Sequence, residues 1–186
     1  MRLPAALAAV AFAIAGTSPL ATAQSTVSLD AAARDTSWRE LVRPAYRMAY
    51  PADWDLDSSG TMGTTLLLFS PLADSADRFR ENVNLFRQDL GGTGMDLAQF
   101  TALSVSQVEA MVTDAEIVSN VTESRDGAPY QRVVYTGRQG AFDLQFEQLY
   151  WLSDGEAYIL TLTTERDAFA AYRETGERIL GSFALE

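Results

Sequence analysis

The sequence contains no cysteine, no histidine and no lysine. Without cysteine the chain can form no disulfide and offers no thiol nucleophile, and without lysine it can form no Schiff base. Histidine is the usual general base near neutral pH and, with cysteine, the common zinc ligand. Any catalysis would have to use carboxylates, tyrosine, serine or arginine. We therefore expect a protein that is not an enzyme and that has neither a cofactor nor a metal site.

Long hydrophobic runs are also missing, except near the N-terminus. Arg2 precedes an uncharged, alanine-rich run from Leu3 to Ala15, followed by Ala21-Thr22-Ala23, the small-x-small pattern that signal peptidases accept. The run is shorter than the roughly 20 residues that cross a bilayer as a helix, which disfavours an uncleaved anchor. Gln24 stands where a lipoprotein would need cysteine. We expect residues 1–23 to be a signal peptide cleaved near Ala23, giving a periplasmic or secreted protein without a membrane anchor.

The charge balance is strongly acidic. The chain has 14 basic and 25 acidic side chains and a formal net charge of −11, which becomes −12 when Arg2 leaves with the signal peptide. A field of this sign repels nucleic acid and anionic lipid. We therefore expect no nucleic-acid partner, and consider an envelope protein or a small-molecule ligand instead.

The rest of the chain divides into a lead-in and one domain. Residues 24–43 are polar and alanine-rich, with a possible short helix over Ser37–Val42 that Pro44 would stop. Residues 44–186 are enough for one domain of ordinary size and too few for two.

Alternation and turn signals predict two blocks of strands. The first comprises 46–50, 54–57, 64–70 and 82–88, and the second 115–123, 130–138, 141–152 and 158–164. Asp126-Gly127 and Asp154-Gly155 are two-residue hairpin signals. The run 66–69 is apolar on both faces and needs cover on both sides of a sheet. Asp143, Gln145 and Glu147 share one face of their strand, which we expect to be solvated.

Each block is followed by a predicted helix. The first, over 96–112, has an apolar stripe at helical spacing made of Leu97, Phe100, Leu103, Val108 and Met111. The second begins at Thr164 as N-cap, and its stripe consists of Phe169, Tyr172, Gly176, Ile179, Leu180 and Phe183. A glycine inside a helix costs about 1 kcal/mol relative to alanine, so Gly176 predicts a close approach of this helix to the sheet. Hairpin-connected strands with two helices define the α+β class.

Four segments, in this order, resemble the PsbP-like (PsbP/DcrB-type) family: Tyr50-Pro51-Ala52-Asp53-Trp54, Phe79-x-x-Asn82-Val83-Asn84-Leu85, Gly155-x-Ala157-Tyr158-Ile159-Leu160-Thr161 and Ile179-Leu180-x-Ser182-Phe183. The resemblance implies an exported bacterial member with an α/β/α sandwich, that is, a twisted antiparallel sheet of about six to seven strands with helices on both faces. It implies binding or accessory roles and no catalytic residue. The shared residues that we expect to determine the fold are Tyr50, Pro51, Trp54, Asn82, Tyr158 and Phe183.

Three patterns invite sharper hypotheses. Asp53, Asp55 and Asp57 have the spacing of the first ligands of a calcium loop, but Ser58 and Thr64 occupy the places that need glycine and glutamate. Asp143 and Glu147 could form a glycosidase pair, yet four residues of strand separate them by about 13 Å, and pairing with Arg132 or Arg138 on the neighbouring strand is favoured. The glycines of the segment 91–94 match no phosphate-binding spacing, and indicate a flexible loop.

Two function classes remain. The favoured one is a non-catalytic exported accessory or binding module that uses a sheet edge or a groove to hold a protein partner or a small ligand. The alternative is a carboxylate-dependent hydrolase of the cell envelope. A carboxylate enclosed in a pocket would favour the second.

Overall fold

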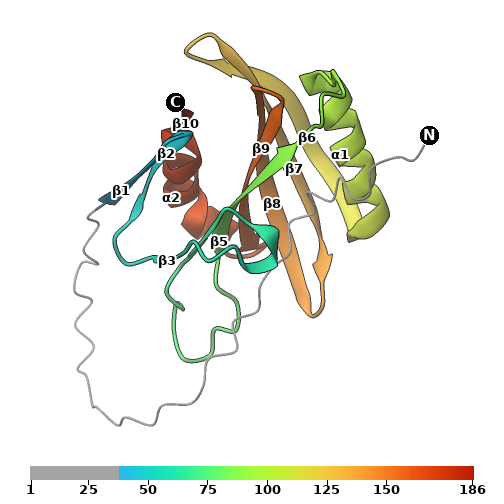
Figure 1. Cartoon of the computed structure of the whole chain (residues 1–186). Helices are drawn as coiled ribbons and strands as arrows, with labels where there is room; N and C mark the ends of the chain where they lie inside the picture. The colour runs from blue at the N-terminus through green and yellow to red at the C-terminus, as the bar shows by residue number, and fades with distance from the viewer. Residues whose placement is uncertain (1–37) are drawn as a thin grey trace.

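The computed structural model describes residues 38–186. The expected signal peptide and residues 24–37 lie outside this range. The elements in chain order are β1 (Trp38–Arg43), β2 (Tyr46–Pro51), β3 (Asp55–Asp57), a 3-10 turn (Thr61–Gly63), β4 (Leu66–Phe69), β5 (Asn82–Asp89), α1 (Leu97–Met111), β6 (Thr113–Arg125), β7 (Ala128–Gln139), β8 (Phe142–Ser153), β9 (Glu156–Glu165), α2 (Phe169–Ser182) and β10 (Ala184–Leu185) (Figure 1).

The strands form two antiparallel sheets. The larger has seven strands in the order β3-β4-β5-β9-β8-β7-β6, and the smaller has the order β1-β2-β10. Both predicted hairpin turns are present, since Asp126-Gly127 joins β6 to β7 and Asp154-Gly155 joins β8 to β9. All four residues have positive φ angles, from 51° to 81°, as a two-residue turn of this kind requires. The expectation of an α+β fold built on an antiparallel sheet is confirmed.

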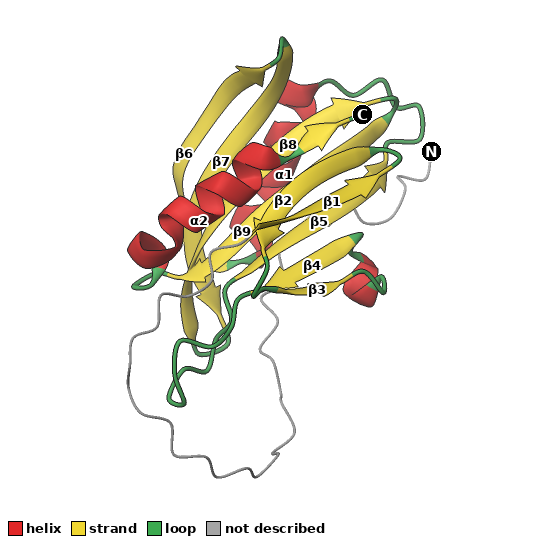
Figure 2. Ribbon diagram, turned by 90° about the vertical axis from the view of Figure 1, so that its left-hand side faces the viewer, coloured by secondary structure: helices red, strands yellow, loops and turns green. Residues whose placement is uncertain are grey.

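The two faces of the large sheet carry separate apolar cores. On β8, Leu149 and Trp151 belong to one core, whereas Phe146 and Tyr150 belong to the other. The first core includes residues of α2 and of β2, and the second includes residues of α1. Figure 2 shows α2 lying across the near face of the sheet, with α1 behind it. In the described part of the chain neither helix is long and apolar enough to cross a membrane.

Helix α1 begins as predicted. The Asp96 side chain accepts a hydrogen bond from the Gln99 backbone N–H at 2.8 Å, and the Gln99 side chain accepts one from the Asp96 N–H at 3.0 Å. This reciprocal capping satisfies two otherwise free donors. The predicted apolar stripe is only partly right: Phe100 and Val108 are buried, but Met111 is 55 % exposed. Val112 takes its place in the core because the chain leaves the helix there.

Helix α2 begins later than predicted. β9 extends to Glu165, and the residue that precedes the helix is Ala168, without a side-chain cap. Thr164 as N-cap is therefore wrong, because its backbone still pairs with Gln145 of β8. The prediction for Gly176 is confirmed: a β-carbon there would lie 2.4 Å from a methyl carbon of Leu162 on β9.

The short helix expected over Ser37–Val42 is also wrong. Residues 38–43 form β1, which pairs with β2 along its whole length. Leu41 is buried in the core beside α2, and the Arg178 guanidinium of α2 lies 3.9 Å from the centre of the Trp38 ring. A helix of six residues is marginal by itself, whereas the strand gains a ladder and a core contact. The packed unit therefore includes residues that the sequence assigned to the lead-in.

The tip of the β6–β7 hairpin holds the C-terminal end of α2. The Arg125 guanidinium donates to the backbone oxygen of Phe183 at 2.9 Å and, more weakly, to that of Leu180 at 3.4 Å. The same guanidinium lies 5.3 Å from the centre of the Tyr130 ring. A cation at these free carbonyl groups also suits the negative end of the helix dipole.

The close contact at Gly176 predicts opposite effects of two alanine substitutions in α2. Gly176→Ala should lower the free energy of unfolding by about 1–3 kcal/mol, because the added methyl group overlaps Leu162. Gly181→Ala should raise it by up to about 1 kcal/mol, because nothing lies within 4 Å of that position and alanine favours helix. Urea denaturation measures both, and a stabilising Gly176→Ala would contradict the packing.

Candidate functional site

Helix α2 leaves one part of its own sheet face uncovered. It packs mainly on β2 and β9, so strands β6, β7 and β8 extend beyond it on the same side (Figure 2). The side chains that this part of the sheet presents there are mostly polar, and we call them the polar face: Ser119, Val121, Glu123, Arg132, Val134, Thr136, Gln145 and Glu147. β6 is also the long edge strand of the sheet.

Arg132 organises the middle of the polar face. It forms ion pairs with Glu147 of β8 and with Glu123 of β6, the latter at 2.9 Å, and Tyr130 hydrogen bonds to Glu123. The pairing of Glu147 with Arg132 confirms the sequence interpretation. The expected solvation of this face is wrong at Glu147, which is only 5 % exposed. A carboxylate buried to this extent needs its guanidinium partner.

Electrostatics around Glu123 favour its ionised form. The hydrogen bond from Tyr130 lowers the pKa of Glu123; partial burial opposes this, and the hydrogen bond and charge of Arg132 add to it. The group therefore contributes stability at neutral pH that is lost as the pH falls through its lowered pKa. Glu123 and Glu147 share the Arg132 guanidinium, and the charge of Arg125 also acts on Glu123.

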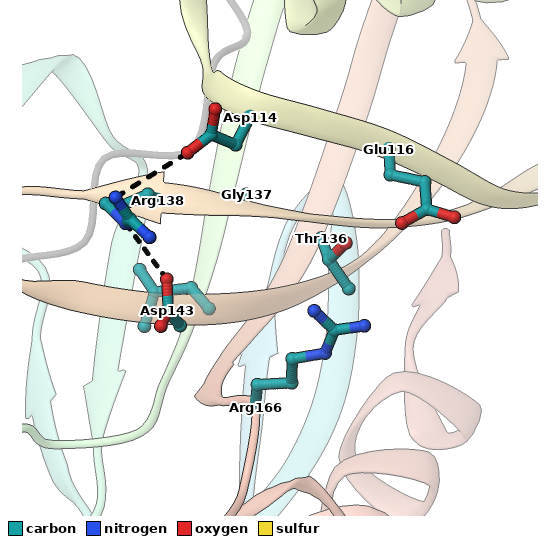
Figure 3. Close-up of a pocket in the computed structure, with 8 residues that line it drawn as sticks. Asp114, Glu116, Thr136, Gly137, Arg138, Asp143 and Arg166 are labelled. Atoms are coloured by element: carbon teal, nitrogen blue, oxygen red, sulfur yellow. Dashed lines mark hydrogen bonds and ion pairs between the residues drawn. The ribbon is translucent and has the colours of Figure 1, made fainter.

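A pocket of about 320 Å³ lies at one end of the polar face. Its lining residues come from β6, β7, β8 and the segment after β9: Asp114, Glu116, Thr136, Gly137, Arg138, Asp143, Leu144 and Arg166. Arg138 lies between two carboxylates, 3.0 Å from Asp143 and 3.7 Å from Asp114 (Figure 3). The hydrogen bond that Arg138 donates to Asp143 and the negative charges of both carboxylates raise the pKa of Arg138. Arg138 is therefore already paired with Asp114 and Asp143 at the rim of the pocket.

Arg166 is the second cation of the pocket. Its backbone N–H donates to the Asp143 carbonyl at 2.9 Å, which holds the chain after β9 against β8. Its exposed side chain extends toward Thr136 and Glu116 (Figure 3). Within residues 38–186 neither Arg166 nor Glu116 has an ion-pair partner. Arg166 was not predicted from the sequence. The feature that could have indicated it is its position as a basic residue between two acidic ones, Glu165 and Asp167.

A second depression of about 510 Å³ shares Asp143 and Arg166 with the pocket. It continues toward the start of α2 and is lined also by Glu165 and Asp167. Burial raises the pKa of Glu165, and the charges of Asp77 and Asp167 raise it further. The polar face therefore ends in a region that holds more carboxylates than guanidinium groups.

Glu81 is a buried carboxyl group that forms no ion pair with any residue from 38 to 186. Glu81 is 2 % exposed and accepts a hydrogen bond from the Ser70 hydroxyl at 3.2 Å. Burial raises the pKa of Glu81, although hydrogen bonds from its own backbone N–H, from Ser70 and with Tyr172 lower it. A carboxyl group with a raised pKa is a feature of general acids. Glu81, however, lines none of the pockets described above.

Two of the carboxylates considered as calcium ligands already form hydrogen bonds within the fold. Asp55 accepts a hydrogen bond from Arg80 at 2.6 Å, and Asp57 accepts bonds from the Ser59 backbone N–H at 2.7 Å and from the Thr61 hydroxyl at 3.2 Å. The two bonds to Asp57 close a turn after β3, and the bond from Arg80 ties Asp55 to the segment before β5. From residue 38 onward, no group of three or more acidic side chains is placed to hold a metal ion.

The six residues expected to determine the fold are all buried: Tyr50, Pro51, Trp54, Asn82, Tyr158 and Phe183. The Trp54 backbone N–H donates to the Pro51 carbonyl at 3.1 Å, and its ring meets that of Tyr172 edge-on at 6.4 Å. The Asn82 side chain donates to the Arg80 carbonyl at 3.2 Å. These residues lie in the core and not in the pocket.

Comparison with known proteins identifies the fold. No family model and no curated protein matches the sequence. Among solved structures, cyanobacterial PsbP (CyanoP) from Synechocystis sp. PCC 6803 aligns with a TM-score of 0.61 and 15 % identity, covering 85 % of this chain and 99 % of that one. PA94 of Pseudomonas aeruginosa, a protein of unknown function, aligns with a TM-score of 0.55 and 14 % identity. The alignment covers 72 % of this chain and 87 % of that one. LpqN, involved in cell envelope biogenesis of Mycobacterium tuberculosis, aligns with a TM-score of 0.54 and 13 % identity. The alignment covers 82 % of this chain and 93 % of that one.

The chain therefore has the PsbP-like fold, and the resemblance that the sequence indicated is confirmed at the level of the fold. At these identities the likeness carries no residue role from one protein to another.

Phe183 offers a test of the expected fold determinants. Its ring lies 4.9 Å from that of Trp151 and 5.7 Å from that of Tyr46, measured between centroids, so it joins the end of α2 to both sheets. Phe183→Ala should cost about 3–5 kcal/mol of unfolding free energy. Phe169→Ala, at the half-buried start of α2, serves as control and should cost clearly less. Equal costs in urea denaturation would contradict this role of Phe183.

The buried carboxyl group predicts a stability that depends on pH. The pKa of Glu81 is raised in the folded state, so its ionisation weakens the fold as the pH rises through that value. Glu81→Gln keeps a hydrogen-bond acceptor and removes the charge. The variant should therefore be more stable than the original protein near neutral pH, by up to about 1 kcal/mol, and lose this advantage near pH 4.

Chemical denaturation at both pH values measures the effect, with Glu109→Gln on the exposed side of α1 as control. A Glu81→Gln variant that is less stable at neutral pH, or equally stabilised at both, would contradict the account.

Proposed function

We propose that this protein is an exported, non-catalytic accessory module that holds a small ligand or a protein partner on the polar face and its end pocket. The observation that carries the proposal is the pocket itself. Residues from four separate segments of the chain line it. It exposes the guanidinium of Arg166 and the carboxylate of Glu116, neither of which forms an ion pair with another described residue. Convergent polar groups in a concave site are the usual mark of ligand binding.

The N-terminal sequence and the fold support this proposal. The N-terminal sequence has the features of a signal peptide, and we propose a periplasmic or secreted location after cleavage near Ala23. We also propose the α/β/α sandwich arrangement of PsbP-like proteins for residues 44–186, extended by β1. LpqN, whose fold is similar, is described as involved in cell envelope biogenesis. We propose that this chain also acts in the cell envelope.

The alternative function is a carboxylate-dependent hydrolase of the cell envelope. One observation favours it, namely the raised pKa of the buried Glu81. Two others oppose it: Glu81 is almost completely enclosed, and Glu147, the other buried carboxylate, is neutralised by Arg132. A general acid must come within hydrogen-bond distance of its substrate. We therefore prefer binding to hydrolysis.

Mapping by NMR tests the proposed function. Low-molecular-mass and macromolecular fractions of a periplasmic extract are added separately to the ¹⁵N-labelled domain. Binding should shift amide signals of β6, β7 and β8 around Val121 and Thr136, and leave those of the exposed side of α1, such as Glu109, unchanged. Shifts confined to α1, or none with any fraction, would contradict the proposal. Loss of an envelope polymer on incubation, abolished by Glu81→Gln, would favour the hydrolase.

A further inference from the structure

The end pocket contains one charge of each sign that is available to a ligand. Arg138 is already engaged with Asp114 and Asp143. The two charged side chains that remain are Glu116 and Arg166, which do not pair with each other. The field inside the pocket therefore changes sign from one side to the other.

The sheet register fixes the arrangement of these groups. Glu116 of β6 pairs with Thr136 of β7, Thr136 pairs with Gln145 of β8, and Gln145 pairs with Thr164 of β9. Directly paired residues lie on the same face, so the four form a row across the sheet. Arg166 follows two residues after Thr164 and extends back toward Thr136 (Figure 3). Thr136, 4 % exposed, thus lies in the floor of the pocket between the two free charges.

The row also contains an unused hydrogen-bonding group. The Thr164 hydroxyl is fully buried and has no hydrogen-bond partner among residues 38–186. An unsatisfied buried polar atom destabilises a fold.

The charges around the pocket disfavour ligands of a single sign. A purely anionic ligand would meet Arg166 but also the carboxylates of Asp114, Glu116 and Asp143, within a chain whose net charge is −11. A purely cationic ligand would meet two guanidinium groups in the same pocket. A molecule with a negative group at one end and a positive group at the other avoids both repulsions.

We propose that the pocket binds a zwitterion, namely an α-amino acid or a short peptide with free termini. Arg166 would bind the ligand carboxylate through its planar fork of donors, and Glu116 would bind the ammonium group. The volume of about 320 Å³ is near the lower end for small-molecule sites, which matches a ligand of this size. The adjoining depression beyond Arg166 offers room for the further residues of a peptide. This inference rests on the proposed function and adds the class of ligand.

Calorimetric and NMR titration of the purified protein with alanine and with dialanine tests the inference. Binding of dialanine should weaken by roughly 10-fold or more when its amino group is acetylated or its carboxyl group amidated, since each change removes one charged hydrogen-bonded contact. Alanine binding as tightly as dialanine identifies an amino-acid site, and tighter binding of dialanine identifies a peptide site.

Variants assign the two contacts. Arg166→Met should weaken dialanine binding by roughly 10-fold or more and make it insensitive to amidation, whereas Glu116→Gln should make it insensitive to acetylation. Arg173→Met, on the exposed side of α2, is the matched control and should bind like the original protein. Amide spectra of each variant verify the fold.

Three results would overturn the inference: no binding of alanine or dialanine, equal binding of the capped peptides, or full affinity in Arg166→Met. None of them by itself removes the proposed binding function, which fails only if the extract fractions leave the polar face unperturbed.

Discussion

Helix α2 approaches β9 so closely that a β-carbon at Gly176 would lie 2.4 Å from Leu162. This contact sets the position of the helix on the sheet, and Arg125 holds its far end through the carbonyl groups of Leu180 and Phe183. A helix fixed there covers β9 and the small sheet. Strands β6, β7 and β8 consequently keep a face that neither α1 nor α2 covers, and the pocket forms where that face meets the chain entering α2.

The polar face is built differently from the core beneath it. On β8, alternate residues point to opposite sides of the sheet, so Phe146 and Tyr150 lie in the core under α1 while Gln145 and Glu147 face the other way. Burying Glu147 is costly unless a cation accompanies it, and Arg132 supplies that cation. Stability of this face therefore depends on ion pairs, whereas the opposite face depends on apolar packing.

Local sequence signals predicted much of this fold. The two Asp-Gly turns, the start of α1 near Asp96 and the close approach at Gly176 each depend on a few neighbouring residues, and each is present. The errors have a common physical origin, because they depend on partners distant in sequence. Thr164 was predicted as a helix cap, but its backbone pairs with β8. A short helix was predicted over Ser37–Val42, but the chain from residue 38 pairs with β2. The pocket was missed for the same reason: Glu116 and Arg166 are 50 positions apart and meet only through the sheet register.

The central claim is that β6, β7 and β8 present an open polar face beside α2. Methyl NMR with a soluble paramagnetic probe measures this directly. Val121 and Val134 lie on that face, whereas their neighbour Val133 points into the core under α1 and is fully buried. We expect strong relaxation enhancement at Val121 and Val134 and almost none at Val133. Equal protection of all three would show that the face is covered in solution and would contradict the account.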